Sequence, residues 1–259
     1  MNPSRPVVLC FSGHDPSGGA GVQADIETIF SHCCHPASVI TALTEQDSHN
    51  VKKLIPQRPD DIISQAETLL ADFDVAVIKI GLIGDASVAR AIAEILPTSI
   101  PVVLDPVLAA GGGTELASQE LIETIVERLL PLTTIITPNS EEARRLSGKQ
   151  ALNDCARWLQ AKGADHVLIT GTHEQSELVQ NCLYMPDELT ETFNWERLPH
   201  HYHGSGCTLA SSIASMLARG LDMFTAVNEA QEFTWQSLAA ADKPGHGQYN
   251  PNRLFWMDA

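Results

Sequence analysis

The sequence of 259 residues has few basic side chains: 16 Lys and Arg stand against 32 Asp and Glu, a formal net charge of −16 at pH 7. The mean field of such a chain repels phosphate, which argues against extended binding to DNA, RNA or an anionic membrane. A single phosphate-bearing ligand is still compatible if local backbone N–H groups and a cation receive it. Apolar residues make up 44% and charged residues 19%, the composition of a globular protein.

Long apolar runs are also missing from the sequence. A membrane-spanning helix needs about 18–20 apolar residues in a row, and no run comes near that length. The run at residues 7–11 is too short for a signal-peptide core of roughly 7–15 residues. The six cysteines include no C-x-x-C pair and are too sparse for a disulfide scaffold. We therefore predict a protein of the reducing cytoplasm.

Buried strands and amphipathic helices alternate along most of the chain. The pattern predicts strands at residues 6–12, 37–43, 75–80, 101–104, 134–137 and 166–170, and helices at 18–31, 60–71, 86–96, 118–130, 140–146, 152–162, 206–218 and 223–241. This alternation is typical of an α/β fold with a mostly parallel central sheet and helices on both faces. No linker or internal repeat interrupts it, so we predict one domain over residues 1–259.

Residues 177–184 and 192–198 depart from this alternation and predict a small hairpin at one edge of the sheet. The hairpin could act as a lid. Because an edge strand exposes unpaired backbone groups, it could also pair with a second copy of the chain in a homodimer.

The first glycine-rich segment, residues 13–21, nearly matches a phosphate-binding P-loop but lacks its Lys and its Ser/Thr. Four residues separate Gly13 from Gly18, yet the next two positions are Gly19 and Ala20. The segment therefore has no charge for phosphates and no hydroxyl for Mg²⁺. The dinucleotide motif G-x-G-x-x-G is absent as well. What is left is a turn whose backbone can approach a small ligand closely, or an ordinary turn between a strand and a helix.

The second glycine-rich segment, Gly204-Ser205-Gly206-Cys207-Thr208, stands at the start of a predicted helix. Backbone N–H groups at a helix start carry partial positive charge and can bind an anion. Cys207 falls in the first turn, where the helix dipole should lower its pKa below about 8.5 and let it accept a hydroxyl proton. The segment predicts an oxyanion cradle beside a base; a helix cap followed by a small buried cysteine is the alternative.

Polar residues recur at the carboxyl ends of the predicted strands, where α/β sheets bind their ligands. Asp105 and Glu142 could together hold Mg²⁺, directly or through water, because this ion keeps several waters. Glu142 opens a helix after Asn139, so a helix cap is the alternative. The run at residues 200–203 lacks a clear third and fourth zinc ligand, and indicates a solvated loop with His203 near the anion site.

Together, these segments resemble the hydroxymethylpyrimidine/phosphomethylpyrimidine kinases of thiamine biosynthesis, in the ribokinase superfamily. The resemblance covers about residues 7–247. The matching segments are residues 12–21, 23–25, 39–43, 79–81, 104–107, 137–139 with Glu142, and 203–209. The resemblance implies a ribokinase-like fold and two successive MgATP-dependent phosphorylations. The first acts on the hydroxymethyl group of 4-amino-5-hydroxymethyl-2-methylpyrimidine, and the second on the resulting monophosphate.

The resemblance also implies roles for individual residues. The substrate-binding residues would be Gln46, Asp25, Gly18, Gly19, Ala20, Leu82 and His14. The amide of Gln46 can donate and accept at once, which suits the edge of an aminopyrimidine. The nucleotide would contact Asn139, Thr170, Thr172 and Thr208, and magnesium would contact Asp105 and Glu142. The anion hole would comprise Gly204, Ser205 and Gly206, with Cys207 as the catalytic base where many superfamily members carry Asp.

Two positions depart from the family pattern. Many of these kinases carry a Lys after the strand that here ends at Thr170, and this Lys can contact ATP phosphates. Its absence would weaken the second phosphorylation unless Mg²⁺ and the helix start suffice. The second departure is His14, where Ser is common. A pyridoxal or pyridoxine kinase is the nearest alternative function, and a non-catalytic pyrimidine sensor is a second alternative, supported only by the missing Lys.

Overall fold

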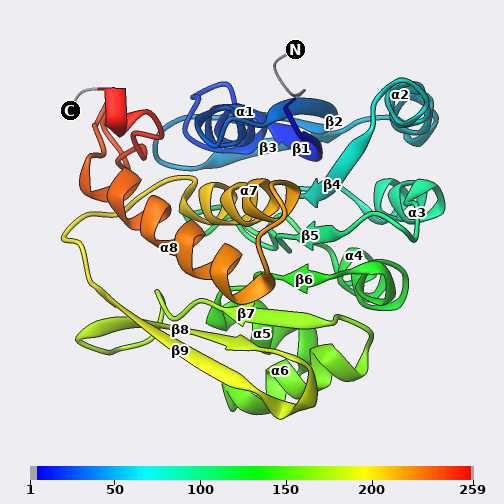
Figure 1. Cartoon of the computed structure of the whole chain (residues 1–259). Helices are drawn as coiled ribbons and strands as arrows, with labels where there is room; N and C mark the ends of the chain where they lie inside the picture. The colour runs from blue at the N-terminus through cyan, green and yellow to red at the C-terminus, as the bar shows by residue number, and fades with distance from the viewer. Residues whose placement is uncertain (1–4, 258–259) are drawn as a thin grey trace.

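The computed structural model describes residues 5–257, and nine strands within this range form one sheet in the order β3-β2-β1-β4-β5-β6-β7-β8-β9 (Figure 1). The strands are β1 (Val7–His14), β2 (His35–Gln46), β3 (Val51–Pro56), β4 (Val75–Ile80), β5 (Val102–Leu104), β6 (Ile135–Ile136), β7 (His166–Ile169), β8 (Leu178–Tyr184) and β9 (Thr190–Glu196). The helices are α1 (Gly21–Ser31), α2 (Pro59–Asp72), α3 (Ala86–Ile95), α4 (Gln119–Thr124), α5 (Ser140–Ser147), α6 (Leu152–Ala161), α7 (Ser205–Ala218) and α8 (Met223–Ala239).

The central strands β2, β1, β4, β5, β6 and β7 are parallel. The predicted edge hairpin is confirmed as β8 and β9, which pair antiparallel beside β7. The prediction of a mostly parallel α/β sheet is thus confirmed. One continuous sheet is consistent with one domain, but the single-domain organisation of residues 1–259 stays a prediction.

The opposite edge of the sheet contains a strand that the sequence analysis missed. Strand β3 pairs antiparallel with β2, which itself extends to Gln46 rather than ending near residue 43. Its exposed residues include Lys52 and Lys53, which weaken the apolar pattern of a strand. Lysines on an edge strand oppose pairing with another chain, so this composition fits the position of β3.

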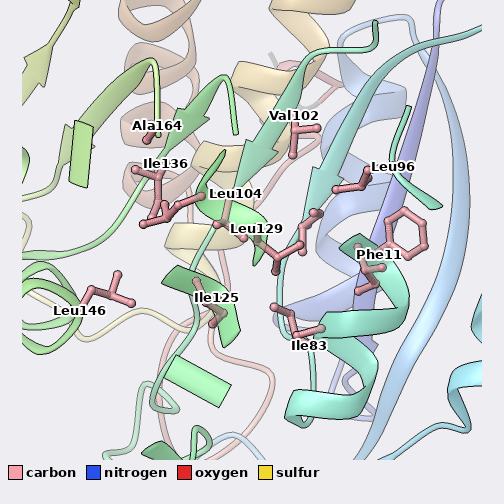
Figure 2. Packing of buried hydrophobic residues seen from close by; sticks show 14 of the residues in the cluster. Phe11, Ile83, Leu96, Val102, Leu104, Ile125, Leu129, Ile136, Leu146 and Ala164 are labelled. Atoms are coloured by element: carbon pink, nitrogen blue, oxygen red, sulfur yellow. The ribbon is translucent and has the colours of Figure 1, made fainter. Parts of the chain in front are cut away.

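Side chains alternate between two apolar layers because successive residues of a strand point to opposite faces. Leu9 and Phe11 of β1 pack in the larger cluster, whereas Val8 and Cys10 pack in the other. Helices α2 to α6 cover the first face, and α1, α7 and α8 cover the second (Figure 1). Figure 2 shows the larger cluster, in which strand residues such as Leu104 meet residues of the helical segment after α4 such as Leu129.

Two predicted helices are shorter than expected. The helix predicted from residue 18 begins at Gly21, where φ is +61° and a Cβ would stand 2.3 Å from the carbonyl oxygen of Gly13. The helix predicted at 118–130 leaves α-helical geometry after Thr124 and continues as a π-helical turn and a 3-10 turn to Leu132. Pro131 lacks an N–H group and cannot continue an α-helix, which accounts for the end of that segment.

A buried ion pair joins four elements just below the carboxyl ends of the central strands. The Nζ atom of Lys79 on β4 lies 2.9 and 3.0 Å from the two carboxylate oxygens of Asp25 on α1, and both side chains are fully buried. Asp25 also accepts hydrogen bonds from Ser12 of β1 and Ser211 of α7. Burial alone would lower the pKa of Lys79, but the negative groups around it, Asp25 first among them, together outweigh burial and the pKa is raised.

We expect Asp25→Ala to lower the free energy of unfolding by about 3–5 kcal/mol, because it leaves the Lys79 charge buried without a partner. Urea denaturation measures the effect. The double variant Asp25→Leu/Lys79→Met should recover much of the loss, since it removes both charges. Glu67→Ala on the exposed face of α2 is the matched control and should change stability by less than about 0.5 kcal/mol. Equal effects of Asp25→Ala and the control would contradict this account of the ion pair.

Candidate active site

A cavity of about 390 Å³ lies at the carboxyl ends of the parallel strands. Each of the six strands contributes a residue at or just after its end. These residues are Gln46 (β2), His14 (β1), Leu82 (β4), Asp105 (β5), Asn139 (β6) and Thr170 (β7). Because ligands of such sheets bind beyond the carboxyl ends, this cavity is the candidate active site.

The start of α7 forms one wall of the cavity through Gly204, Ser205, Gly206 and Cys207. Gly204 has φ +82°, and a Cβ there would stand 2.0 Å from the carbonyl oxygen of Gly19, so only glycine fits. No side chain caps this helix, which leaves its first N–H groups available to an anion. A Cβ on Gly206 would stand 3.7 Å from Asp105 Oδ2, so the helix start and this carboxylate are neighbours.

The expected lowering of the Cys207 pKa is wrong. Burial, reinforced by the Asp105 and Asp25 charges, raises the pKa of the thiol to about 11, although Lys79 acts in the opposite direction. Desolvation of the thiolate is the largest cause of this rise. At neutral pH, Cys207 carries its proton in this structure.

Asp105 and Glu142 form a buried carboxyl pair in the cavity wall. Burial raises the pKa of Asp105 to about 6, and burial with the Asp105 charge raises the pKa of Glu142 to about 8. Glu142 also completes a capping box with Asn139: Asn139 N donates to Glu142 Oε2 at 2.9 Å, and Glu142 N donates to Asn139 Oδ1 at 2.9 Å. The helix-cap interpretation of Glu142 is thus confirmed, and its part in holding Mg²⁺ stays a prediction.

The donor set of this pair fits a magnesium ion. Asp105 Oδ2 is buried and has no hydrogen-bond partner, although a buried carboxylate oxygen ordinarily has one. No group of three or more Asp, Glu, His or Cys residues suited to a metal occurs among residues 5–257. Mg²⁺ needs only one or two carboxylates, with water and phosphate oxygens as its other ligands, whereas a structural zinc site needs four protein ligands.

Protein stability should fall as pH rises from 5 to 8 in metal-free buffer. Above pH 4 the unfolded chain has lost the protons of these two carboxyl groups, whereas the folded protein still holds them. The bound protons stabilise the folded state, and this stabilisation is lost as pH rises through the two raised pKa values. Since one pKa unit corresponds to about 1.4 kcal/mol, we expect a loss of at least about 2 kcal/mol in urea denaturation. Glu142→Gln keeps an acceptor for the capping box and should flatten the slope above pH 6; an unchanged slope would contradict the assignment.

The structure places four of the seven expected substrate residues on the cavity wall: Gln46, Leu82, His14 and Ala20. Asp25, Gly18 and Gly19 do not line the cavity in this structure, so their part in substrate binding stays a prediction. The Asp25 carboxylate is fully buried and forms an ion pair with Lys79. Gly18 belongs to the tight turn after Asp15, and Gly19 packs against His203, whose Cδ2 would stand 2.4 Å from a Cβ at position 19.

Among the expected nucleotide residues, Asn139, Thr170 and Thr172 line the cavity and Thr208 does not. The Thr208 hydroxyl is buried, donates to the carbonyl of Gly204 and accepts from Arg253 Nε at 2.9 Å. Arg253 also donates to the carbonyl of Gly19, and so fastens the start of α7 to the first glycine-rich turn. The sequence analysis missed Arg253 because the family resemblance ends near residue 247.

A second missed cation lies where the family's Lys is absent. Arg197, just after β9, lines the cavity and donates to the carbonyl oxygens of Thr172, Glu174 and Ser176. These hydrogen bonds connect the loop after β7 to the end of the hairpin β8–β9. The hairpin also contributes residues to the cavity wall. A cation that reaches the site from a distant segment gives no local signal in the sequence.

The hairpin and α8 enclose the part of the cavity beyond Thr172. Trp195 Nε1 and Asn181 Nδ2 both donate to Gln231 Oε1, at 3.1 and 2.8 Å, and all three side chains line the cavity. Trp235 lies on the same wall. These residues were not predicted, because single aromatic and amide side chains on a hairpin and a helix show no motif.

The cysteines and the apolar helices bear on the expected redox state and location. All six cysteines are free thiols in the structure, and the reducing cytoplasm stays a prediction. Within residues 5–257, no helix has the length and apolar character that crossing a bilayer requires.

The sheet order, the uncapped start of α7 and the neighbouring carboxyl pair are features of a ribokinase-like kinase with a candidate site at the carboxyl ends of the strands. The chain belongs to the phosphomethylpyrimidine kinase family, whose model matches residues 15–252. The hydroxymethylpyrimidine/phosphomethylpyrimidine kinase of Haemophilus influenzae is 36% identical, over 94% of this chain and 95% of that protein.

Solved structures agree with this assignment. The ADP complex of Bacillus subtilis pyridoxal kinase has a TM-score of 0.90 and 28% identity, and the match covers 98% of this chain and 99% of that one. The phosphomethylpyrimidine kinase of Clostridium difficile has a TM-score of 0.78 and 30% identity, over 90% of this chain and 100% of that one. These neighbours have the same ribokinase-like fold, which confirms the predicted fold class.

Proposed function

We propose that this kinase phosphorylates 4-amino-5-hydroxymethyl-2-methylpyrimidine and then its monophosphate, with ATP as the donor, in thiamine biosynthesis. The observation that carries the proposal is one cavity lined both by the amide of Gln46 and by an uncapped helix start beside a carboxyl pair. The amide suits an aminopyrimidine edge, and the helix start suits a phosphoryl group. Membership of the phosphomethylpyrimidine kinase family supports the same substrate.

Catalysis would rest on positioning and on charge stabilisation, as in phosphoryl transfer generally. The N–H groups of residues 204–207 would stabilise the negative charge of the transferring group. Asp105 and Glu142 would hold Mg²⁺, which neutralises phosphate charge when bound. Arg197 would keep the loop at 172–176 in place beside the phosphates without contacting the reacting atoms.

Cys207 would accept the proton of the acceptor hydroxyl. The raised pKa means that only a small fraction of the thiol is ionised at neutral pH, and Lys79 is the nearby charge that favours the thiolate. The reaction would then proceed through the ionised fraction of the thiol, because only the thiolate can accept the proton. The rate should then depend strongly on pH.

Mass spectrometry of products after incubation with MgATP and the hydroxymethylpyrimidine tests the proposed function. We expect the monophosphate to appear first and the diphosphate to follow. Absence of both phosphates with an otherwise folded enzyme would contradict the proposal. The diphosphate also tests whether the site without a Lys at position 170 supports the second step.

Cys207→Ala should lower kcat by about 10²-fold or more, the usual contribution of a positioned base. At saturating Mg²⁺, which keeps Asp105 and Glu142 ionised, the wild-type rate should also rise towards about tenfold per pH unit between pH 7 and 9, because deprotonation of the thiol is required. The variant should be nearly independent of pH under the same conditions. Steady-state kinetics across this range measures both effects. A variant with near wild-type kcat and the same pH profile would remove Cys207 from the mechanism.

Pyridoxal kinase is a second candidate, favoured by the close match to the Bacillus subtilis enzyme of that name. Parallel turnover of pyridoxal and the hydroxymethylpyrimidine, compared as kcat/KM, decides between them. The non-catalytic sensor is the weaker alternative, and pyrimidine-dependent consumption of ATP would eliminate it. A cytoplasmic location, the lack of nucleic-acid and membrane partners, and a homodimer stay predictions from the sequence.

A further inference from the structure

His203 connects three parts of the site that lie far apart in the sequence. It immediately precedes Gly204 at the start of α7, and its backbone N–H donates to the carbonyl of Tyr249. Its Nε2 atom lies 2.9 Å from Asp15 Oδ2 in the first glycine-rich turn, and 2.9 Å from the amide nitrogen of Gln46 at the end of β2. The side chain is only 12% exposed, so water does not replace these contacts.

Asp15 is an ionised carboxylate with four hydrogen-bond donors around it. Burial disfavours its charge, but hydrogen bonds from His203 and Ser17 lower its pKa to about 2. Ser17 donates through both N and Oγ, and Ala20 N donates to Oδ2 at 2.8 Å. A carboxylate accepts hydrogen bonds and does not donate them, so the atom that faces Asp15 must carry hydrogen. His203 therefore carries a hydrogen on Nε2.

This proton determines the orientation of the Gln46 amide. A single ring nitrogen cannot donate to Asp15 and at the same time accept from an amide N–H. The nitrogen and oxygen of a side-chain amide exchange places by a half-turn about its last bond, and the hydrogen-bond network decides between the two. Only the orientation with Oε1 towards His203 is consistent with a protonated Nε2. The NH₂ group of Gln46 is then directed away from His203.

We propose that His203 is a positioning residue for the acceptor substrate: it holds the Gln46 amide oxygen through Nε2–H and so presents the Gln46 NH₂ group to the cavity. This inference rests on the proposed function. The presented NH₂ group donates to a ring nitrogen of the aminopyrimidine, and the second lone pair of Oε1 accepts from the neighbouring amino group. The substrate class selected is a heteroaromatic ring with an acceptor nitrogen beside an amino donor.

The packing around His203 supports a fixed ring rather than a mobile one. A Cβ on Gly19 would stand 2.4 Å from His203 Cδ2, so the absence of a side chain at position 19 makes room for the imidazole. Gly19 is thus required by the site although it does not line the cavity. Because His203 is covalently attached to Gly204, the geometry of the substrate amide is linked to that of the anion hole.

Steady-state kinetics of wild type, His203→Phe, Gln46→Ala and the double variant tests the inference, with the hydroxymethylpyrimidine and ATP varied in turn. We expect His203→Phe to raise KM for the pyrimidine about tenfold and KM for ATP less than twofold, because binding to the acceptor alone is weakened. The double variant should be within about twofold of Gln46→Ala, because His203 acts through Gln46. His203→Gln, which retains an N–H donor, should recover part of the loss.

His35→Phe is the matched control, since His35 is exposed at the opposite end of β2, and it should leave both KM values unchanged. Independent, multiplicative effects of the two single variants, or equal rises in both KM values, would overturn the role of His203. If His203→Phe does not fold, the comparison of His203→Gln with Gln46→Ala carries the same test. A wild-type enzyme that does not phosphorylate the pyrimidine would instead overturn the proposed function.

Discussion

The site depends on one buried interaction, the ion pair between Lys79 and Asp25 beneath the carboxyl ends of the strands. It connects β4 to α1, and through Ser12 and Ser211 it also connects β1 and α7. A buried charge without a partner is costly, so these four elements are held in one arrangement. The start of α7 lies directly above this ion pair, and its position relative to the sheet is therefore fixed before any ligand binds.

The same burial that fixes the site also changes the acid–base chemistry of its residues. Asp105, Glu142 and Cys207 all have raised pKa values because their charged forms are poorly solvated, and the negative groups raise one another further. Such a cluster favours the arrival of a cation. Asp15, by contrast, is surrounded by hydrogen-bond donors and stabilised as an anion, and it serves the acceptor side of the cavity through His203.

Much of the fold could be predicted from the sequence, because buried parallel strands are continuous apolar runs and the helices between them have regular apolar spacing. Strand β3 was missed since its exposed lysines hide the pattern. In the site, the residues at strand ends were found from motifs, whereas Arg197, Trp195 and Arg253 were not, because distant segments bring them there. The Cys207 pKa was predicted with the wrong sign, since a helix dipole can be inferred from sequence position but desolvation depends on packing.

The central claim is that the terminal phosphate of the nucleotide and the hydroxyl of the acceptor meet at residues 204–207, above the Lys79–Asp25 pair. A crystal structure with a non-hydrolysable ATP analogue, Mg²⁺ and the hydroxymethylpyrimidine tests this most directly. The account predicts hydrogen bonds from the N–H groups of residues 204–207 to the terminal phosphate, with the hydroxymethyl oxygen beside Cys207 Sγ. A phosphate chain bound far from this helix start, or a thiol shielded from both ligands, would contradict it.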